Sequence, residues 1–106
     1  MTKVNKENDN DTILLEEKKT ELKKPDMYKV IFHNDDYTTM EFVIFVLQAV
    51  FQKSEYESID IMLEVHHNKL SVVGIYTKDV ANTKISETMK LAEEFEYPLL
   101  VTMEKN

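Results

Sequence analysis

A change of composition at Pro25 divides the chain into two parts. Apolar residues occupy six of the first 24 positions but 39 of the 82 positions from Pro25 onward. A segment as polar as residues 1–24 buries too little surface to offset its ordering entropy, so we expect a disordered N-terminal tail there. Residues 25–106 are long enough for one small domain with its own core. The sequence therefore predicts a single folded domain over 25–106.

Three β-rich runs in this domain are separated by longer stretches with a different periodicity. We predict strands over Met27–His33, Leu70–Thr77 and Leu99–Glu104. Gly74, the only glycine, lies inside the second run, where a glycine indicates the close approach of a neighbouring group.

Between these runs, apolar residues recur at helical spacing. We predict helices from Thr39 to about Lys53, from Glu55 to about His67, and from Thr77 or Lys78 to about Glu96. Thr38 with Glu41 forms a capping box that would begin the first helix, and Ser54 with Glu57 forms another for the second. Asn68 is expected to end the second helix in a left-handed conformation.

The predicted element order is β-α-α-β-α-β, which is an α+β pattern. Its simplest solution is a small three-stranded antiparallel sheet packed against three helices on one face. No repeat interrupts this pattern.

Composition excludes several classes of function. The net charge is −7 and all 13 basic residues are lysine, which argues against nucleic acid and anionic membrane surfaces as partners. The chain has no cysteine, which excludes disulfides and thiolate chemistry and fits a reducing compartment. The longest apolar run, Phe42–Leu47, is far shorter than the ~20 residues of a membrane span, and no signal peptide is evident. We expect a soluble, cytoplasmic protein.

The polar sequence Asn34-Asp35-Asp36 follows a predicted strand and precedes a predicted helix. One interpretation is an ordinary turn, because Asn and Asp side chains bond their own backbone. The other is an acceptor-rich corner that attracts a cation, an amine or a metal. The sequence alone leaves both open.

His66, near the end of the second predicted helix, also has two interpretations. It is a packing residue, or it joins Asp35 and Asp36 in a metal site or an acid–base pair. No nucleophile or oxyanion element accompanies such a pair, so a small metal-dependent enzyme is the weaker alternative. We expect no enzyme activity and no cofactor.

Met40 and Val43 share one face of the first helix, and Met62 and Val65 share one face of the second. They belong to the core, or they line an adaptable apolar pocket beside the Asn34 corner. An apolar pocket with an anionic rim suits an amine that carries a hydrophobic side chain.

These residues resemble the signature of a known family. The matching segments are Asn34–Thr38, Met40–Val43, Ile61–Leu63, Val65–His66, Gly74, Tyr76–Thr77, Val80–Ala81, Thr83–Lys84 and Pro98–Leu100. Together they resemble ClpS, the adaptor of the ATP-dependent Clp protease, over essentially all of residues 26–106. The resemblance implies a non-enzymatic adaptor that binds proteins with an N-terminal Leu, Phe, Tyr or Trp (N-degrons). It would deliver them to a Clp AAA+ ATPase of the ClpA or ClpC type.

The resemblance also implies roles for individual residues. Asn34, Asp35 and His66 would hold the substrate α-amino group, with Asp36 in support. The first side chain would enter a pocket formed by Phe32, Thr38, Met40, Val43, Met62, Val65 and Leu99, and Met40 would exclude β-branched side chains. Asp79 and Lys84 would face the ATPase, and the tail would serve delivery rather than docking.

Four positions depart from the family pattern, and two of them, Phe45 and Val73, are local substitutions. Thr39 replaces a common proline, and Lys69 replaces a frequent glycine, so Asn68 is expected to carry the left-handed turn. Phe45 would add apolar surface without a family role. A regulator of the Clp ATPase that does not bind degrons is the remaining alternative, and a monomer is the default because no dimer seam is evident.

Overall fold

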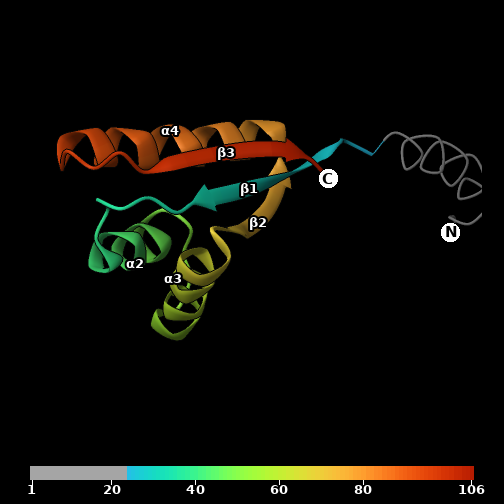
Figure 1. Cartoon of the computed structure of the whole chain (residues 1–106). Coiled ribbons are helices and arrows are strands. Elements are labelled where there is room, and N and C mark those ends of the chain that lie inside the picture. The colour runs from blue at the N-terminus through green and yellow to red at the C-terminus, as the bar shows by residue number, and fades with distance from the viewer. Residues whose placement is uncertain (1–23) are drawn as a thin grey trace, which may run out of the picture.

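In a computed structural model, residues 24–106 are described, so all but the last residue of the predicted tail over 1–24 lie outside the described residues. The element order agrees with the predicted β-α-α-β-α-β pattern (Figure 1). The elements are β1 (Met27–His33), α2 (Met40–Ala49), α3 (Glu55–Asn68), β2 (Leu70–Thr77), α4 (Lys78–Glu94) and β3 (Leu100–Lys105).

The three strands form one antiparallel sheet with β1 in the centre, in the order β2-β1-β3. Along β1, Val30 is opposite Gly74 and Ile31 is opposite Val72, so Val73 is an extra residue in β2. Such a β-bulge bends its strand and increases the local twist. Figure 1 shows β2 curving away from β1 toward α3.

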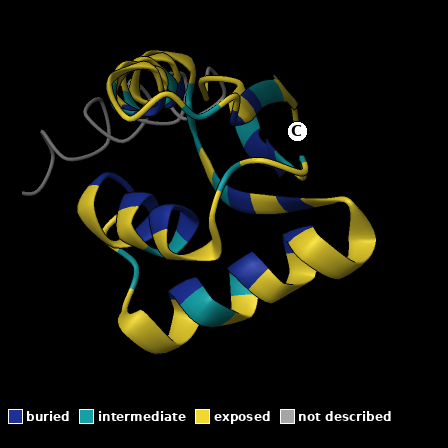
Figure 2. Cartoon of the chain, turned by 60° about the vertical axis from the view of Figure 1, so that its left-hand side comes forward, coloured by how far each residue is buried: buried dark blue, intermediate teal, exposed yellow. Residues whose placement is uncertain are grey.

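The core lies on one face of this sheet, as predicted. Val30, Phe32, Val73 and Val101 turn inward from the strands and join a single buried cluster with residues of all three helices. Helix α4 contacts all three strands, whereas α3 packs against α2 and β2. In Figure 2 the buried residues of the helices form narrow stripes and their outer sides are exposed.

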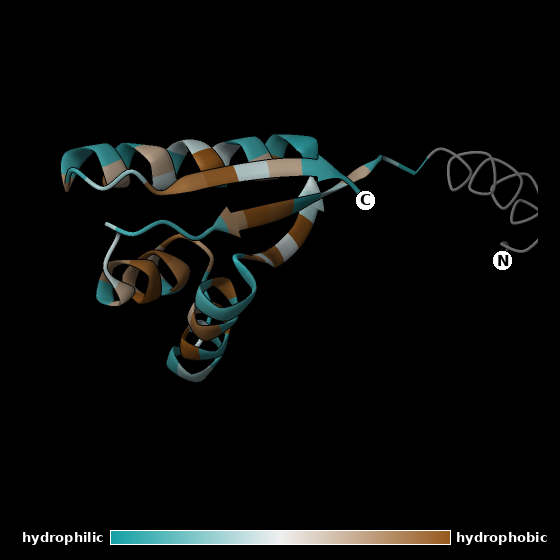
Figure 3. Ribbon diagram, viewed as in Figure 1, coloured by the Kyte–Doolittle hydropathy of each residue, from teal (hydrophilic) through white to brown (hydrophobic). Residues whose placement is uncertain are grey.

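The opposite face of the sheet has no helix on it within residues 24–106. Ile31 in the central strand is buried on this face, but Leu70, Val72, Ile75 and Leu100 around it are each 42–50% exposed. Helix α4 is mostly hydrophilic on its visible outer side, whereas α2 and β1 are largely hydrophobic (Figure 3). One apolar layer between sheet and helices therefore holds the domain together.

Helix α2 begins one residue later than the predicted capping box requires. Thr39, not Thr38, is the N-cap, and its hydroxyl accepts a hydrogen bond from the backbone N–H of Phe42 at 3.2 Å. The Thr38 hydroxyl instead donates to Asp35. The helix also ends at Ala49 rather than near Lys53.

Helix α3 begins with the predicted capping box. Ser54 and Glu57 exchange hydrogen bonds of 3.0 and 3.1 Å between side chain and backbone. At the other end the prediction was wrong: Asn68 is still helical, and Lys69 takes the left-handed conformation with φ 75°. The chain turns into β2 there.

The last predicted boundaries shift by one or two residues. Helix α4 ends at Glu94, and Glu96 then turns with φ 62°, so that the Tyr97 N–H donates to the Ala92 carbonyl at 2.8 Å. Strand β3 starts at Leu100 rather than Leu99.

Candidate functional site

A cavity of about 470 Å³ opens where the loop after β1 meets α2 and α3. We call it the Asn34 cavity. It is lined by Asn34, Asp35, Asp36, Tyr37, Thr38, Thr39, Met40, Val43, Met62, Val65 and His66. This one cavity therefore contains all three predicted amine-binding residues. It also contains five of the seven predicted pocket residues, namely Thr38, Met40, Val43, Met62 and Val65.

Asp35 organises the polar side of this cavity. Its Oδ1 accepts hydrogen bonds of 2.7 Å from the backbone N–H groups of Tyr37 and Thr38, and its Oδ2 accepts one of 2.7 Å from the Thr38 hydroxyl. The predicted Asx turn and the predicted acceptor-rich corner thus coexist in one loop. Two carboxylate oxygens provide about four acceptor sites, so capacity for a further donor remains.

Two opposing effects act on the pKa of Asp35. Partial burial raises it, but the hydrogen bonds from the Thr38 N–H, the Thr38 hydroxyl and the Tyr37 N–H together outweigh burial and lower it below the usual 3.8. These donors favour the charged form. Asp35 is therefore an anion at neutral pH and suits a cationic partner.

Asn34 is fixed by a backbone hydrogen bond to the residue that follows α3. Its N–H donates to the Lys69 carbonyl at 2.9 Å, immediately after α3 ends. This bond joins the loop to the α3–β2 connection. It keeps Asn34 and Asp35 near His66, which lies in the last turn of α3 with an exposed ring.

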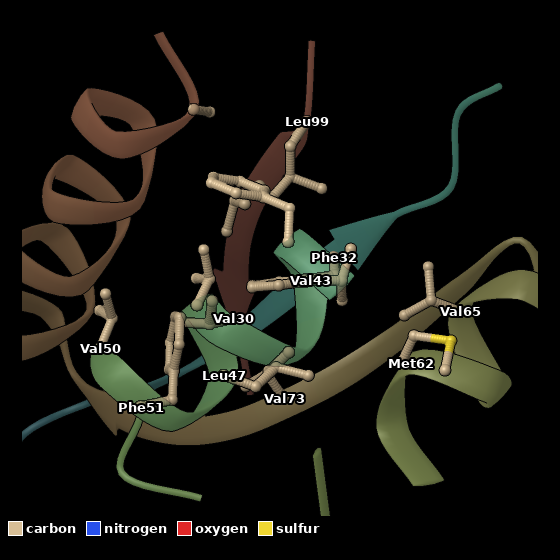
Figure 4. Packing of buried hydrophobic residues seen from close by; sticks show 14 of the residues in the cluster. Val30, Phe32, Val43, Leu47, Val50, Phe51, Met62, Val65, Val73 and Leu99 are labelled. Carbon is tan, nitrogen blue, oxygen red and sulfur yellow. The ribbon is translucent and has the colours of Figure 1, made fainter. Parts of the chain in front are cut away.

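The apolar side of the cavity comes from two helices. Val43 on α2 and Met62 and Val65 on α3 are at most 8% exposed, whereas Met40 is 46% exposed. Figure 4 shows Met62 and Val65 projecting from α3 toward Val43 and Phe32. An apolar side chain entering here would meet buried walls, with the mobile thioether of Met40 exposed beside it.

Two predicted pocket residues do not line this cavity. Phe32 is fully buried in the core, and Leu99 is 2% exposed. Leu99 lines a separate groove of about 500 Å³ between α4 and the start of β3. The lining of the Asn34 cavity also contains two residues that the prediction omitted, Tyr37 and Thr39. Tyr37 belongs to the Asp35 turn and Thr39 caps α2, and these positions next to predicted site residues were the available signal.

The predicted ATPase-facing residues lie together on α4. Asp79 and Lys84 line a depression of about 350 Å³ with Gln52, Val80, Thr83 and Glu87. The Lys84 Nζ donates to the Val50 carbonyl at 2.8 Å and to Gln52 Oε1 at 2.9 Å. It also lies 5.7 Å from the centre of the Phe51 ring and 5.6 Å from that of Tyr76. Lys84 thus holds the C-terminal end of α2.

Gly74 allows the Tyr76 ring to lie where it does, near Lys84. A Cβ at position 74 would lie 2.5 Å from the Tyr76 hydroxyl oxygen, so the missing side chain makes room for the Tyr76 ring. The close neighbour predicted from the sequence is therefore a residue of the same strand. Burial raises the pKa of the Tyr76 hydroxyl.

The metal-site alternative finds no support in the side-chain arrangement. Within residues 24–106, no group of three or more His, Asp or Glu side chains is positioned to hold a metal ion, and this includes Asp35, Asp36 and His66. In the same range, no helix is both long and apolar enough to cross a bilayer.

Comparison with known proteins identifies the class. Residues 23–102 match the family described as ATP-dependent Clp protease adaptor protein ClpS. The adapter protein ClpS of Myxococcus xanthus is 50% identical over 98 residues, which cover 92% of each chain. That of Clostridium acetobutylicum is 52% identical over 85 residues, which cover 80% of this chain and 84% of the relative.

A solved structure agrees with these relatives. The structure of Agrobacterium tumefaciens ClpS2 bound to L-phenylalaninamide matches with a TM-score of 0.76 and 41% sequence identity. It covers 78% of this chain and 100% of the other. The family match and the relatives define an adaptor of an ATP-dependent protease, a binding protein rather than an enzyme. The chain belongs to the ClpS family.

Proposed function

We propose that this adaptor binds proteins with an N-terminal Leu, Phe, Tyr or Trp and delivers them to a Clp AAA+ ATPase. The observation that carries this proposal is the Asn34 cavity, which combines an anionic, acceptor-rich rim with buried apolar walls. The structural neighbour was solved with L-phenylalaninamide, a small molecule with a free α-amino group and a phenyl side chain. That chemistry supports the same division of roles in this chain.

In this proposal Asn34, Asp35 and His66 bind the α-ammonium group, which has three donors. Each charge-assisted hydrogen bond contributes about 1.5–3 kcal/mol, and burial of a Leu or Phe side chain adds about 1.5–3 kcal/mol. Association costs about 4 kcal/mol or more. At the upper end of these values the affinity is roughly micromolar.

Delivery needs a second surface. We propose that Asp79 and Lys84 on α4 contact a ClpA-type or ClpC-type ATPase, and that residues 1–24 support transfer of the substrate. The domain over 25–106 would then be the docking unit, working as a monomer in the cytoplasm. A chain without cysteine agrees with a reducing compartment.

Fluorescence anisotropy with three labelled peptides tests the proposal. One begins with Phe, one with N-acetyl-Phe and one with Ile, and the remaining residues are identical. We expect micromolar or tighter binding to the first peptide alone. Acetylation removes the charge and two donors and leaves the acceptors unpaired, which weakens binding by about tenfold to a hundredfold or more.

Asp35→Ala gives the matching result on the protein side, with Asp60→Ala as control. Asp60 is an exposed carboxylate on α3 outside the cavity lining. We expect Asp35→Ala to lose peptide binding and Asp60→Ala to keep it. If no peptide binds while the ATPase is still captured, the chain is a regulator of the ATPase and the degron proposal fails.

A further inference from the structure

An aromatic groove lies beside the Asn34 cavity, and the proposed function does not use it. Its volume is about 280 Å³, and its lining consists of Thr39, Glu41, Phe42, Phe45, Phe95 and Tyr97. The Phe42 ring centre lies 5.4 Å from that of Phe95 and 4.8 Å from that of Tyr97. Phe45 is 46% exposed and Phe95 is 53% exposed. Two segments distant in sequence thus expose aromatic rings to solvent at the same place.

The groove suits a cation. Aromatic faces carry the negative part of the ring quadrupole and attract guanidinium and ammonium groups. The Glu41 carboxylate belongs to the lining, and within residues 24–106 it takes part in no ion pair. The domain around it holds 14 acidic residues and 7 lysines. Charge and ring chemistry therefore favour the same occupant.

The groove adjoins the Asn34 cavity at Thr39. Thr39 lines both, caps α2, and donates from its hydroxyl to the Tyr97 hydroxyl oxygen at 3.4 Å. The two are therefore separated by the N-terminal end of α2, and a helix with its side chains is about 10–12 Å wide. An extended peptide advances about 3.3–3.6 Å per residue. The fourth residue of a bound chain is three such steps from the first, so the fourth or fifth residue reaches this distance.

We propose that the aromatic groove is a second subsite for the substrate. It takes the side chain of an arginine or lysine at position 4 or 5 of the substrate, counted from the N-terminal residue as position 1. This inference rests on the proposed function, since the first residue must be held in the Asn34 cavity. The groove ranks substrates that share an N-terminal residue. Arginine is preferred because its planar guanidinium stacks on rings.

Anisotropy with peptides that begin with Phe tests this inference. A single arginine is placed in turn at positions 2 to 6 of an otherwise neutral chain. We expect binding to be about three- to tenfold tighter with arginine at position 4 or 5 than with glutamine there. We expect the gain to disappear in Glu41→Gln and in Phe45→Ala. Tyr56→Ala, which removes an exposed ring from α3, and Glu55→Gln serve as matched controls.

The outcomes separate the two proposals. If the Phe peptide binds but arginine has no effect at any position, the subsite inference fails and the proposed function stands. An equal gain at every position, or a gain that survives Glu41→Gln, indicates general attraction to an acidic domain and also overturns the subsite. Tighter binding of leucine than arginine, or a dimer lost in Phe45→Ala, assigns the groove to another occupant. If no Phe peptide binds, both proposals fail.

Discussion

At the scale of single residues, Asp35 carries both structure and charge. Its three hydrogen bonds within the loop hold the turn between β1 and α2, and they keep the carboxylate ionised. An amine ligand therefore meets an acceptor that is already oriented. Thr38, which the sequence suggested as a pocket side chain, uses its hydroxyl for this carboxylate.

Thr38→Val tests this role. Valine keeps the shape of threonine but removes the hydroxyl donor, so we expect the pKa of Asp35 to rise toward its unfolded value. Because the pKa is lowered in the folded state, Asp35 contributes stability above its unfolded pKa, and this contribution is lost as pH falls through the lower folded value. The variant loses part of this contribution at neutral pH.

The measurement is an NMR titration of the side-chain carboxyl carbons. The Asp60 signal provides an internal reference, since Asp60 lies outside the loop. An Asp35 titration curve that is identical in both proteins contradicts the role of the Thr38 hydroxyl.

Met40→Ala tests selectivity. Met40 is the only strongly exposed residue among the four apolar helix residues that line the cavity. Truncation widens the entrance, so we expect peptides beginning with Ile or Val to bind about tenfold tighter than they bind the parent. Anisotropy with Phe, Ile and Val peptides measures the change. Met89→Ala, at an exposed methionine outside the cavity, is the control, and unchanged selectivity in Met40→Ala excludes a gatekeeper role.

At the scale of elements, the sequence predicted what local chemistry decides. Ser54 and Glu57 form the capping box that their spacing predicts. Thr38 and Glu41 have the same spacing, but Asp35 takes the Thr38 hydroxyl and the helix begins one residue later. The Asp35 side chain thus determines whether Thr38 or Thr39 caps the helix. The spacing of Thr38 and Glu41 alone could not show this.

The same limit applies to the sites. The polar corner and the helix faces were visible as patterns, and they line one cavity. The exclusion of Phe32 and Leu99 from that lining was not visible, because it depends on how strand and helix pack. The aromatic groove was also hidden, since Phe45 and Phe95 are 50 positions apart and become neighbours only through the tertiary fold.

Lys69→Gly tests the turn after α3. Lys69 has φ 75°, a conformation that costs a residue with a side chain about 1–2 kcal/mol. Glycine removes this cost but has greater freedom in the unfolded chain, so we expect a net gain of about 0.5–1 kcal/mol in the free energy of unfolding.

Urea denaturation measures the change. Lys78→Gly, at the first residue of α4, provides the matched control and should be destabilising. Equal losses of stability in the two variants would show that the left-handed turn at Lys69 carries no strain.

At the scale of the whole molecule, α2 separates the two candidate surfaces. The Asn34 cavity lies at its N-terminal end, and Lys84 binds the carbonyl that follows its C-terminal end. A helix of 10 residues spans about 15 Å. Substrate and ATPase could therefore be held at the same time, which an adaptor requires.

Removal of residues 1–24 is the prediction at this scale. All residues of the described core lie between Val30 and Val101. We expect the truncated chain to keep the melting temperature and the peptide affinity of the full chain, and to lose substrate delivery in a degradation assay with ATPase and protease. A full-length chain with a scrambled 1–24 segment controls for length. A large drop in melting temperature would show that this segment belongs to the folded domain.

The Asn34 cavity takes its acceptors from a loop held by its own hydrogen bonds, and its apolar walls from two helices. In the proposed function, two of the three amine-binding residues, Asn34 and Asp35, come from the loop, and only His66 comes from a helix that also supplies the apolar walls. Under the proposed function, substitutions on the inner faces of α2 and α3 would change which N-terminal side chain is bound without altering Asn34 and Asp35. The preferred N-terminal side chain can therefore change while the binding of the free amine by the loop is retained.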